Sequence, residues 1–498
     1  MSSDSESRVP LRAFVTDSAL FGIGAMADKL IAFVFLPITA GILGTSGFGV
    51  FALYSTAATI LFMLCSLGMP SAYFRFATDD SIGGDENATL SVAFVTLNLA
   101  SVLWIAAVLP FAGPISSLAI GVDEPWFVYW LCLRTYTDLM ASLADCHLQA
   151  AGKVRLFLAL RVPATVFIRV ATLIVLIQYR SPLALAAGEA MTTALSSLPV
   201  SMWVMREVRL NIDRRLARTM LQYGVTLVPG MLSAWALIAT NRYLIKAFSP
   251  DGVRDVGLYS LGERFSSMIL LVGQTLWLGW RRFGFRNMHR SDGPQMLSRG
   301  LTLYALVASL ATLGVVVLAP GVVYLWMKPE FWPAIPTILP LSLAAFCGAI
   351  ANPLRMGLTK EQRTMTISLL IAFTAVVNVA LAVPLILSSG SFGASVATLV
   401  GQVVGVLATY KVGQRYFPLP IEKDRLFKVA LYCLAVYGVG QLGAMISPLF
   451  GLALGAIALC ALPFALFYFG PLSPQERATV EQALRNGWAM GAALLKPR

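Results

Sequence analysis

The main pattern in this chain is a series of long apolar stretches joined by short polar linkers. A membrane-spanning helix needs about 20 predominantly apolar residues, and fourteen stretches reach this length without the period-two alternation of β-strands. Because the bilayer core offers the backbone no hydrogen-bond partners, these stretches are predicted to be helices. They cover residues 14–41, 48–70, 89–113, 126–150, 156–179, 183–205, 221–248, 256–280, 299–326, 335–358, 365–388, 391–411, 428–447 and 448–470.

The composition supports this interpretation and excludes several classes of function. Hydrophobic residues make up 57% of the 498 residues and charged residues 12%, whereas about a quarter of the residues of a soluble protein are charged. We therefore predict an all-α polytopic membrane protein with no soluble catalytic domain. The chain contains no GxxxxGK motif for nucleotide phosphates, and nucleic acid is not expected as a partner. The six cysteines form no CxxC pair, so no metal site or cofactor is predicted.

The distribution of basic residues predicts the orientation of the chain. Of the 37 lysine and arginine residues, 27 lie at the termini and in one set of alternate loops, and four lie in the other set. Loops rich in lysine and arginine remain on the cytoplasmic side. We therefore expect both termini to be cytoplasmic. The first apolar stretch is too long and too polar for a cleaved signal peptide, since it carries Asp17, Asp28 and Lys29, and it is expected to remain as the first helix.

A weak internal repeat predicts how the spans are grouped. Leu53-Tyr54-Ser55, after the first span, recurs as Leu258-Tyr259-Ser260 after the seventh. A spacing of six spans suits a transporter made of two parallel repeats. We therefore expect an N-terminal six-helix lobe over residues 1–220 and a second over 221–412. Residues 413–498 then hold two additional helices and an amphipathic cytoplasmic tail.

Short motifs around the two copies of this repeat resemble a known family. The segments ITAGILGTSGFGVFALYS (38–55) and TNRYLIKAFSPDGVRDVGLYSLGERFSSM (240–268) are similar to the Wzx-like flippases of the multidrug/oligosaccharidyl-lipid/polysaccharide exporter superfamily. This resemblance implies two six-helix lobes around a central cavity and alternating access. It also implies transfer of polyprenyl-pyrophosphate-linked oligosaccharide from the cytoplasmic to the periplasmic leaflet of the bacterial inner membrane, for O-antigen, capsule or exopolysaccharide. Membrane lipids, a polymerase and glycosyltransferases are the expected partners.

Two features of the sequence depart from the pattern of the relatives. Asn241 stands where relatives often carry an acid before the arginine of the seventh helix, which weakens a proton-coupling role at that position. Relatives that flip the peptidoglycan precursor concentrate arginines on the first two helices, whereas the first two spans here hold only Lys29. The polysaccharide branch is therefore favoured, although fourteen spans also occur in the peptidoglycan branch.

Ionisable residues inside the spans are the strongest candidates for function, because each costs roughly 2.5–3.5 kcal/mol at the centre of a helix. Six basic and six acidic residues lie there, and such a balance indicates that they have partners. The basic ones are Lys29, Arg134, Arg161, Arg169, Arg242 and Arg264. The acidic ones are Asp17, Asp28, Asp138, Asp145, Glu189 and Glu263.

The spacing of these residues puts several of them on shared helix faces. At about 100° per residue, Arg134, Asp138, Ser142, Asp145 and Gln149 fall on one stripe of the fourth span. Three other spans repeat this arrangement. The fifth carries Arg161, Thr165 and Arg169, the sixth carries Glu189, Thr193 and Ser197, and the eighth carries Ser260, Glu263, Ser267 and Gln274. We expect these stripes to line an aqueous cavity between the lobes. The structural alternative is that the charges only pair across helices and fix their packing.

The function predicted from these observations is the flipping of a lipid-linked oligosaccharide. Arginine donors suit a pyrophosphate headgroup, so Arg134, Arg161, Arg169, Arg242 and Arg264 are the predicted substrate-binding residues. The carboxylates Asp28, Asp138, Asp145, Glu189 and Glu263 are predicted to line the cavity or to carry a coupling proton. No catalytic residues are expected.

Two other functions remain open from the sequence. A proton- or sodium-coupled exporter of drugs or metabolites with the same fold would need a smaller cavity and one crucial acid. A membrane polysaccharide polymerase or ligase would usually carry a large periplasmic loop, which the short linkers here do not provide.

Overall fold

The computed structural model describes residues 11–78, 86–206, 208, 213–288, 291–361 and 363–468, with the side chains described from residue 31 onward apart from a few within helices. Every regular element in this part of the chain is a helix. The all-helical prediction is therefore confirmed. Ten of the predicted spans each correspond to one helix, with ends that differ by seven residues at most, and the other four form two longer helices.

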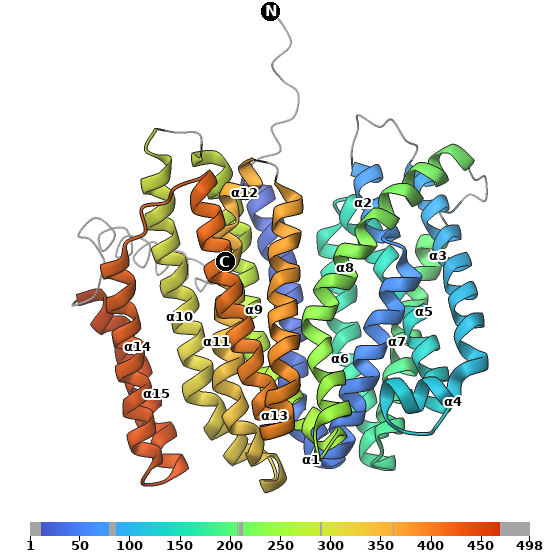
Figure 1. Cartoon of the computed structure of the whole chain (residues 1–498). Helices are drawn as coiled ribbons and strands as arrows, with labels where there is room; N and C mark the ends of the chain where they lie inside the picture. The colour runs from blue at the N-terminus through green and yellow to red at the C-terminus, as the bar shows by residue number, and fades with distance from the viewer. Residues whose placement is uncertain are drawn as a thin grey trace, which may run out of the picture. The chain divides into compact units, whose positions relative to one another are not determined.

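Contacts between residues divide the chain into two compact units. Unit 1 comprises Met1–Arg264, Met327–Thr337 and Ile371–Gly401. Its long helices run alongside one another (Figure 1). They are α1 (Leu11–Ser66), α2 (Met69–Thr78), α3 (Glu86–Val108), α5 (Trp126–Ala150), α6 (Val154–Tyr179), α7 (Pro182–Met205) and α8 (Arg214–Phe248). The short elements η2 (Leu109–Phe111), α4 (Ala112–Ile115), η3 (Ser116–Ile120) and η4 (Pro329–Ala334) also belong to it.

Unit 2 comprises Phe265–Trp326, Ile338–Leu370 and Gln402–Arg498. It contains α10 (Gly293–Trp326), α12 (Met356–Lys360), α14 (Lys423–Ala444) and α15 (Pro448–Tyr468). Three further helices contribute residues to both units: α9 (Val253–Asn287), α11 (Ile335–Leu354) and α13 (Thr364–Tyr416).

Two of the helices each contain two of the predicted spans. The chain turns at Gly44 inside α1, where φ is 68° and ψ is 177°, a conformation that glycine adopts without steric cost. In α13 the turn lies at Ser389 and Gly390. Each turn needs only one or two non-helical residues, so the expected linkers between these spans are largely absorbed into the helices.

Eight helices of the described chain are long and apolar enough to cross a membrane, and α1 and α13 are among them. The predicted spans that fall outside this group are α5, α7, α8 and α9. These four helices carry the polar stripes or charged pairs recognised in the sequence. Together they supply most of the candidate functional residues.

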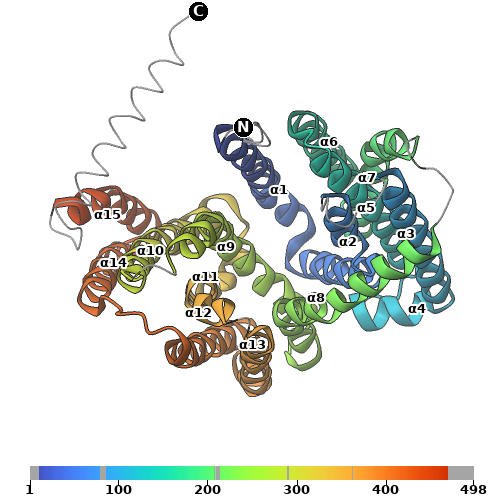
Figure 2. The ribbon, with the colours of Figure 1, turned by 90° about the horizontal axis from the view of Figure 1, so that it is seen from above.

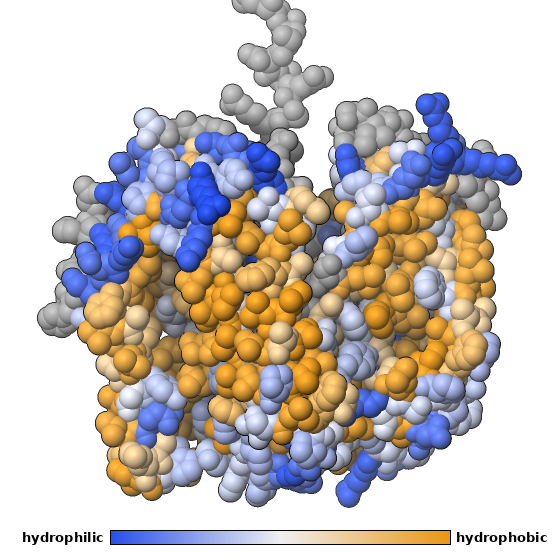
Figure 3. Space-filling model, in the orientation of Figure 1, coloured by the Kyte–Doolittle hydropathy of each residue, from blue (hydrophilic) through white to orange (hydrophobic). Residues whose placement is uncertain are grey.

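The surface of each unit fits a bilayer. On the face shown in Figure 3, apolar side chains cover the middle of each unit, and hydrophilic side chains gather toward its two ends. Large apolar residues such as Val34, Ile174 and Phe464 are more than half exposed, a state that lipid tails accommodate and water does not. Inside unit 1, Tyr54, Tyr73 and Phe127 are fully buried in the core.

The last two helices pack against each other and against α10 (Figure 2). Gly443 in α14 faces the backbone of Gly451 in α15, and Gly440 faces Gly455. Small residues of this kind allow two helix backbones to approach closely inside a membrane. The two helices that follow the predicted repeat are thus packed against α10 within unit 2.

The two copies of the sequence repeat meet within unit 1. A Cβ atom added to Gly49 of α1 would collide with the backbone of Val253 and Gly257 in α9, and one added to Gly257 would collide with Thr45 and Gly49. The first helical turns of the two corresponding segments therefore cross with their backbones in contact. Only glycine permits this approach at both positions.

Candidate functional site

A carboxylate shared by two arginines forms the centre of the candidate site. Arg134 on α5 donates to Glu189 Oε2 at 2.5 Å, and Arg169 on α6 donates to Glu189 Oε1 at 2.8 Å. The Glu189 side chain, on α7, is 8% exposed, whereas the two arginine side chains are 22% and 30% exposed. Glu189 on α7 thus joins arginines on α5 and α6.

A second acid and an aromatic ring also adjoin Arg134. Asp138, one helical turn further along α5, has its Oδ2 atom 3.5 Å from Arg134 Nε. The Arg134 guanidinium carbon also lies 5.6 Å from the centroid of the Tyr54 ring, within the range of a cation–π interaction. Tyr54 belongs to the repeated Leu-Tyr-Ser motif, and the repeat was the only feature of the sequence that could have singled it out.

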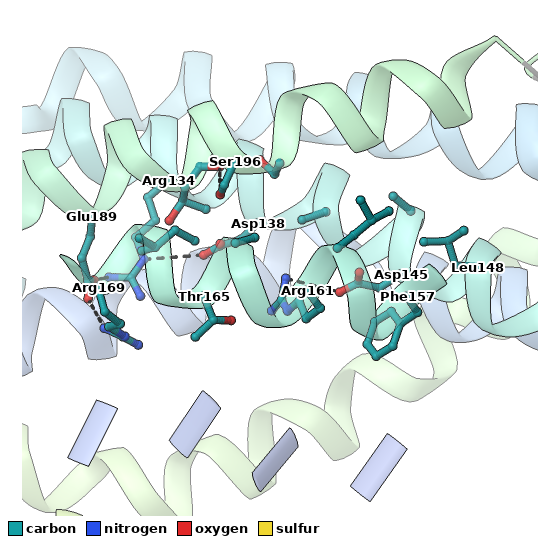
Figure 4. Close-up of a pocket in the computed structure, with 17 residues that line it drawn as sticks. Arg134, Asp138, Asp145, Leu148, Phe157, Arg161, Thr165, Arg169, Glu189 and Ser196 are labelled. Atoms are coloured by element: carbon teal, nitrogen blue, oxygen red, sulfur yellow. Dashed lines mark hydrogen bonds and ion pairs between the residues drawn. The ribbon is translucent and has the colours of Figure 1, made fainter. Parts of the chain in front are cut away.

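The arginines and acids described above line a polar pocket of about 210 Å³ between α5, α6 and α7 (Figure 4). Three arginines and three carboxylates face it: Arg134, Arg161, Arg169, Asp138, Asp145 and Glu189. The hydroxyl side chains are those of Thr165, Thr193, Ser196 and Ser197. The structure thus brings together members of the stripes predicted on three different spans, although Ser142 and Gln149 do not line the pocket.

A further ion pair lies at the opposite end of the pocket from Glu189. Arg161 Nη1 is 3.4 Å from Asp145 Oδ2, and the two side chains are 45% and 24% exposed. Phe157 and Leu148 complete this end (Figure 4). Because the pair is open to solvent, it stabilises the fold less than the buried Glu189 pairs do.

A smaller cavity of about 40 Å³ adjoins this site on the other side of Arg169 and Glu189, and both residues line it too. It lies among α1, α6 and α7 and contains Arg264 of α9. The Arg264 guanidinium carbon is 5.2 Å from the centroid of the Phe48 ring, and its charge interacts with that of Glu189. Arg264 therefore extends the cationic site from α6 toward α9.

Arg242 and Glu263 form a separate pair. Glu263 Oε2 accepts hydrogen bonds from Arg242 Nη2 at 2.6 Å and from Nε at 3.0 Å. Arg242 Nη1 also donates to the Thr56 hydroxyl at 2.6 Å and to the Ala52 carbonyl of α1. Arg242 thus holds Glu263 and joins α8, α9 and α1, a structural role that the sequence did not reveal.

The remaining candidates fall into two groups. Asn241 donates to the Thr398 hydroxyl at 2.8 Å and to the Tyr259 hydroxyl at 3.2 Å. The side chains of Asp17, Asp28 and Lys29 lie outside the part of the molecule that the structure describes. Among the described residues, no group of three or more histidine, cysteine, aspartate or glutamate side chains is placed to hold a metal ion.

Comparison with known proteins identifies the family and the fold. The family model described as "Polysaccharide biosynthesis protein" matches residues 14–274, which is just over half of the chain. A search of curated protein sequences finds no match.

Solved structures with the same fold include a flippase and transporters by title. A lipid II flippase, MurJ, in an inward closed conformation has a TM-score of 0.72 at 12% identity. The match covers 90% of this chain and 99% of the MurJ chain. An inward-facing multidrug resistance MATE family transporter of the MOP superfamily has a TM-score of 0.58 at 15% identity, with coverage of 76% and 94%. An outward-facing structure of a multidrug resistance MATE family transporter of the MOP superfamily has a TM-score of 0.53 at 15% identity. The match covers 81% of this chain and 95% of that transporter.

Proposed function

The chain belongs to the polysaccharide biosynthesis protein family, and we propose that it flips polyprenyl-pyrophosphate-linked oligosaccharides across the bacterial inner membrane. The product would supply the assembly of O-antigen, capsule or exopolysaccharide. Movement would follow alternating access, with the predicted lobes 1–220 and 221–412 rocking about the substrate. A polymerase and glycosyltransferases are the protein partners that this role requires.

The observation that carries this proposal is the convergence of Arg134 and Arg169 on one carboxylate. Two guanidinium groups from different helices are held so that each presents an N–H group to a separate oxygen atom. Guanidinium groups bind phosphate oxygens through the same directed hydrogen bonds. A pyrophosphate that replaced the Glu189 carboxylate would find two donors already oriented.

The charges around the site also favour an anionic headgroup over a cationic drug. The larger pocket is balanced, with three arginines and three carboxylates, and Arg264 in the adjoining cavity adds a further positive charge. When an anion takes over Arg134 and Arg169, Arg264 is the additional cation nearest to the displaced Glu189. The three arginines exceed by one the two negative charges of a pyrophosphate esterified at both ends, which leaves one arginine for the displaced Glu189.

The polar lining of the pocket explains how a large hydrophilic head could cross an apolar layer. The hydrocarbon core penalises exposed polar groups, so a sugar needs a continuous hydrogen-bonding surface during transfer. The stripes on α5, α6 and α7 provide such a surface. The polyprenyl tail needs none, because it is as apolar as the bilayer itself.

The same fold also occurs in MATE transporters, so a proton- or sodium-coupled exporter is the second candidate function. The three carboxylates that line the larger pocket are the observation that favours it. An exporter of cations would depend on Asp138, Asp145 and Glu189, and it would tolerate loss of the arginines.

Substitution of the arginines separates the two functions. In a strain lacking the chromosomal gene, Arg134→Ala, Arg169→Ala and Arg264→Ala should each abolish export of the surface polysaccharide while the protein still inserts at normal abundance. The corresponding lysine variants should restore export only in part, because lysine lacks the planar pair of donors. Arg254→Ala removes an exposed arginine paired with Asp251 and serves as the control. Normal export by all three alanine variants would contradict the proposal.

A further inference from the structure

The pocket continues well beyond the two arginines that would hold the pyrophosphate. On α5 the lining residues run from Arg134 through Asp138 to Asp145, a distance of about 16 Å at 1.5 Å per residue. On α6 they run in the reverse order, from Arg169 through Thr165 to Arg161. Residues of the neighbouring helices therefore lie side by side in layers, as Figure 4 shows.

The layer next to the arginines presents mainly hydrogen-bond acceptors. Ser196 donates its hydroxyl proton to the Thr193 carbonyl at 3.1 Å, and Ser197 donates to the same carbonyl at 2.6 Å. A hydroxyl whose proton is used in this way still has lone pairs that can accept a hydrogen bond. Asp138 adds a carboxylate, which accepts only. A ligand that supplies hydrogen-bond donors therefore suits Asp138, Ser196 and Ser197.

Asp138 is not needed as the counter-ion of Arg134. Glu189 already holds Arg134 at 2.5 Å, whereas Asp138 lies 3.5 Å from Arg134 Nε and its side chain is 39% exposed. Its half-buried carboxylate lines the pocket. Asp138 differs in this respect from Glu189, whose two oxygens both accept hydrogen bonds from arginines.

We propose that Asp138, Ser196 and Ser197 form a sugar subsite that accepts hydrogen bonds from neighbouring hydroxyl groups of the first sugar after the pyrophosphate. The ligand class is a neutral hexose, since a second anionic group would be repelled by the Asp138 carboxylate. The next sugar would reach the end of the pocket formed by Arg161, Asp145 and Phe157. This inference rests on the proposed function, because it takes the pyrophosphate to be held by Arg134 and Arg169.

Binding of two lipids that differ only in one sugar tests the subsite. The probes are polyprenyl pyrophosphate and the same lipid carrying a single glucose, added to the purified protein in detergent. Affinity for each is measured by the change in intrinsic tryptophan fluorescence. We expect glucose to strengthen binding to the parent protein. Asp138→Asn should remove about tenfold of the affinity for the glucosylated lipid, the effect of one hydrogen bond to a charged group, and leave the sugar-free lipid unchanged.

Matched variants distinguish failure of the subsite from failure of the proposed function. Ser142→Ala, on the same helix but outside the pocket lining, should bind both lipids normally. Arg134→Ala should lose both, and if it retains both, the pyrophosphate site itself is wrong. The sugar subsite is overturned if glucose adds no affinity in the parent protein. It is also overturned if Asp138→Asn binds both lipids with the parental affinity, or if it lowers the affinity for both lipids equally. Equal weakening would mean that Asp138 acts only through Arg134.

Discussion

Arg134 and Arg169 lie on different helices and hydrogen-bond to different oxygens of one carboxylate, that of Glu189. The arrangement keeps two cations close together inside a layer that disfavours each of them alone. Under the proposed function, an anionic substrate would compete with Glu189 for the same N–H groups. The acid would then set both the stability of the empty site and the affinity for substrate.

Replacement of Glu189 by glutamine should lower the thermal stability of the protein and increase the stabilisation that anions provide. The glutamine leaves Arg134 and Arg169 without their shared charge, and removing one partner of a buried ion pair is strongly destabilising. We expect the melting temperature in detergent to fall by several degrees. Inorganic pyrophosphate should then raise it by more than it raises that of the parent protein.

The control for this experiment is Glu124→Gln, because Glu124 is an exposed acid of the same unit. It should leave the melting temperature and the response to pyrophosphate unchanged. A Glu189→Gln protein as stable as its parent would show that the shared carboxylate does not hold the helices together.

The glycine contact between α1 and α9 predicts a sharp dependence on side-chain size. Gly49→Ala and Gly257→Ala should each destabilise the protein by about 1–3 kcal/mol, the usual cost of overpacking a closely packed contact. A Cβ at either position would collide with the backbone of the other helix. Thermal unfolding in detergent measures the effect.

A matched glycine in α1 provides the control for this prediction. A Cβ added to Gly41 would meet no atom within 4 Å, and alanine favours helix over glycine by about 1 kcal/mol. Gly41→Ala should therefore be neutral or slightly stabilising. If Gly49→Ala and Gly257→Ala behave in the same way as Gly41→Ala, the close crossing of α1 and α9 is wrong.

The topology prediction follows from the unequal distribution of lysine and arginine between alternate loops. Reporter enzymes fused after residues 120 and 252 should behave as periplasmic. Reporters fused after residues 212 and 290 should behave as cytoplasmic. Reversed signals at two of these four positions would refute the orientation with both termini in the cytoplasm.

Energy coupling is predicted to involve an acid inside a span, with Glu263 as first candidate and Asp28 as second. Burial favours the protonated form of a carboxyl group, and a neighbouring arginine favours the ionised form. Arg242 donates two hydrogen bonds to Glu263, and a movement of α8 relative to α9 would break this pairing. In a reconstituted system, Glu263→Gln should flip substrate without responding to an imposed pH gradient. If Glu263→Gln and Asp28→Asn both retain full flipping and the parental gradient dependence, neither residue carries the proton.

The fold could be predicted in detail because lipid imposes simple rules on length and hydropathy. The helix predicted over 126–150 is α5, with the same limits. The 100° periodicity also placed Arg134, Asp138 and Asp145 on one face, and all three line the pocket. Pairing across helices could not be predicted in this way. No spacing rule within one helix shows that Glu189 is shared by two others, or that Arg242 holds Glu263.

The role of single residues in packing was equally hidden. Gly49 and Gly257 are two among 40 glycines, and only the crossing of their helices distinguishes them. Tyr54 was noticed as part of a repeat, whereas its position beside the Arg134 guanidinium depends on the packing of α1 against α5. Contacts between distant segments therefore account for most of what the sequence left open.

The central claim is that Arg134 and Arg169 hold the pyrophosphate of a lipid-linked oligosaccharide while it crosses the membrane. The most direct measurement uses purified protein in liposomes that contain a polyprenyl-pyrophosphate-linked oligosaccharide, and it follows the fraction of sugar that becomes accessible to an enzyme or lectin outside the vesicles. We predict rapid transfer by the parent protein and by Arg254→Ala, and transfer at least tenfold slower with Arg134→Ala or Arg169→Ala, the loss expected for hydrogen bonds between charged groups. Parental rates in both pocket variants would contradict the account.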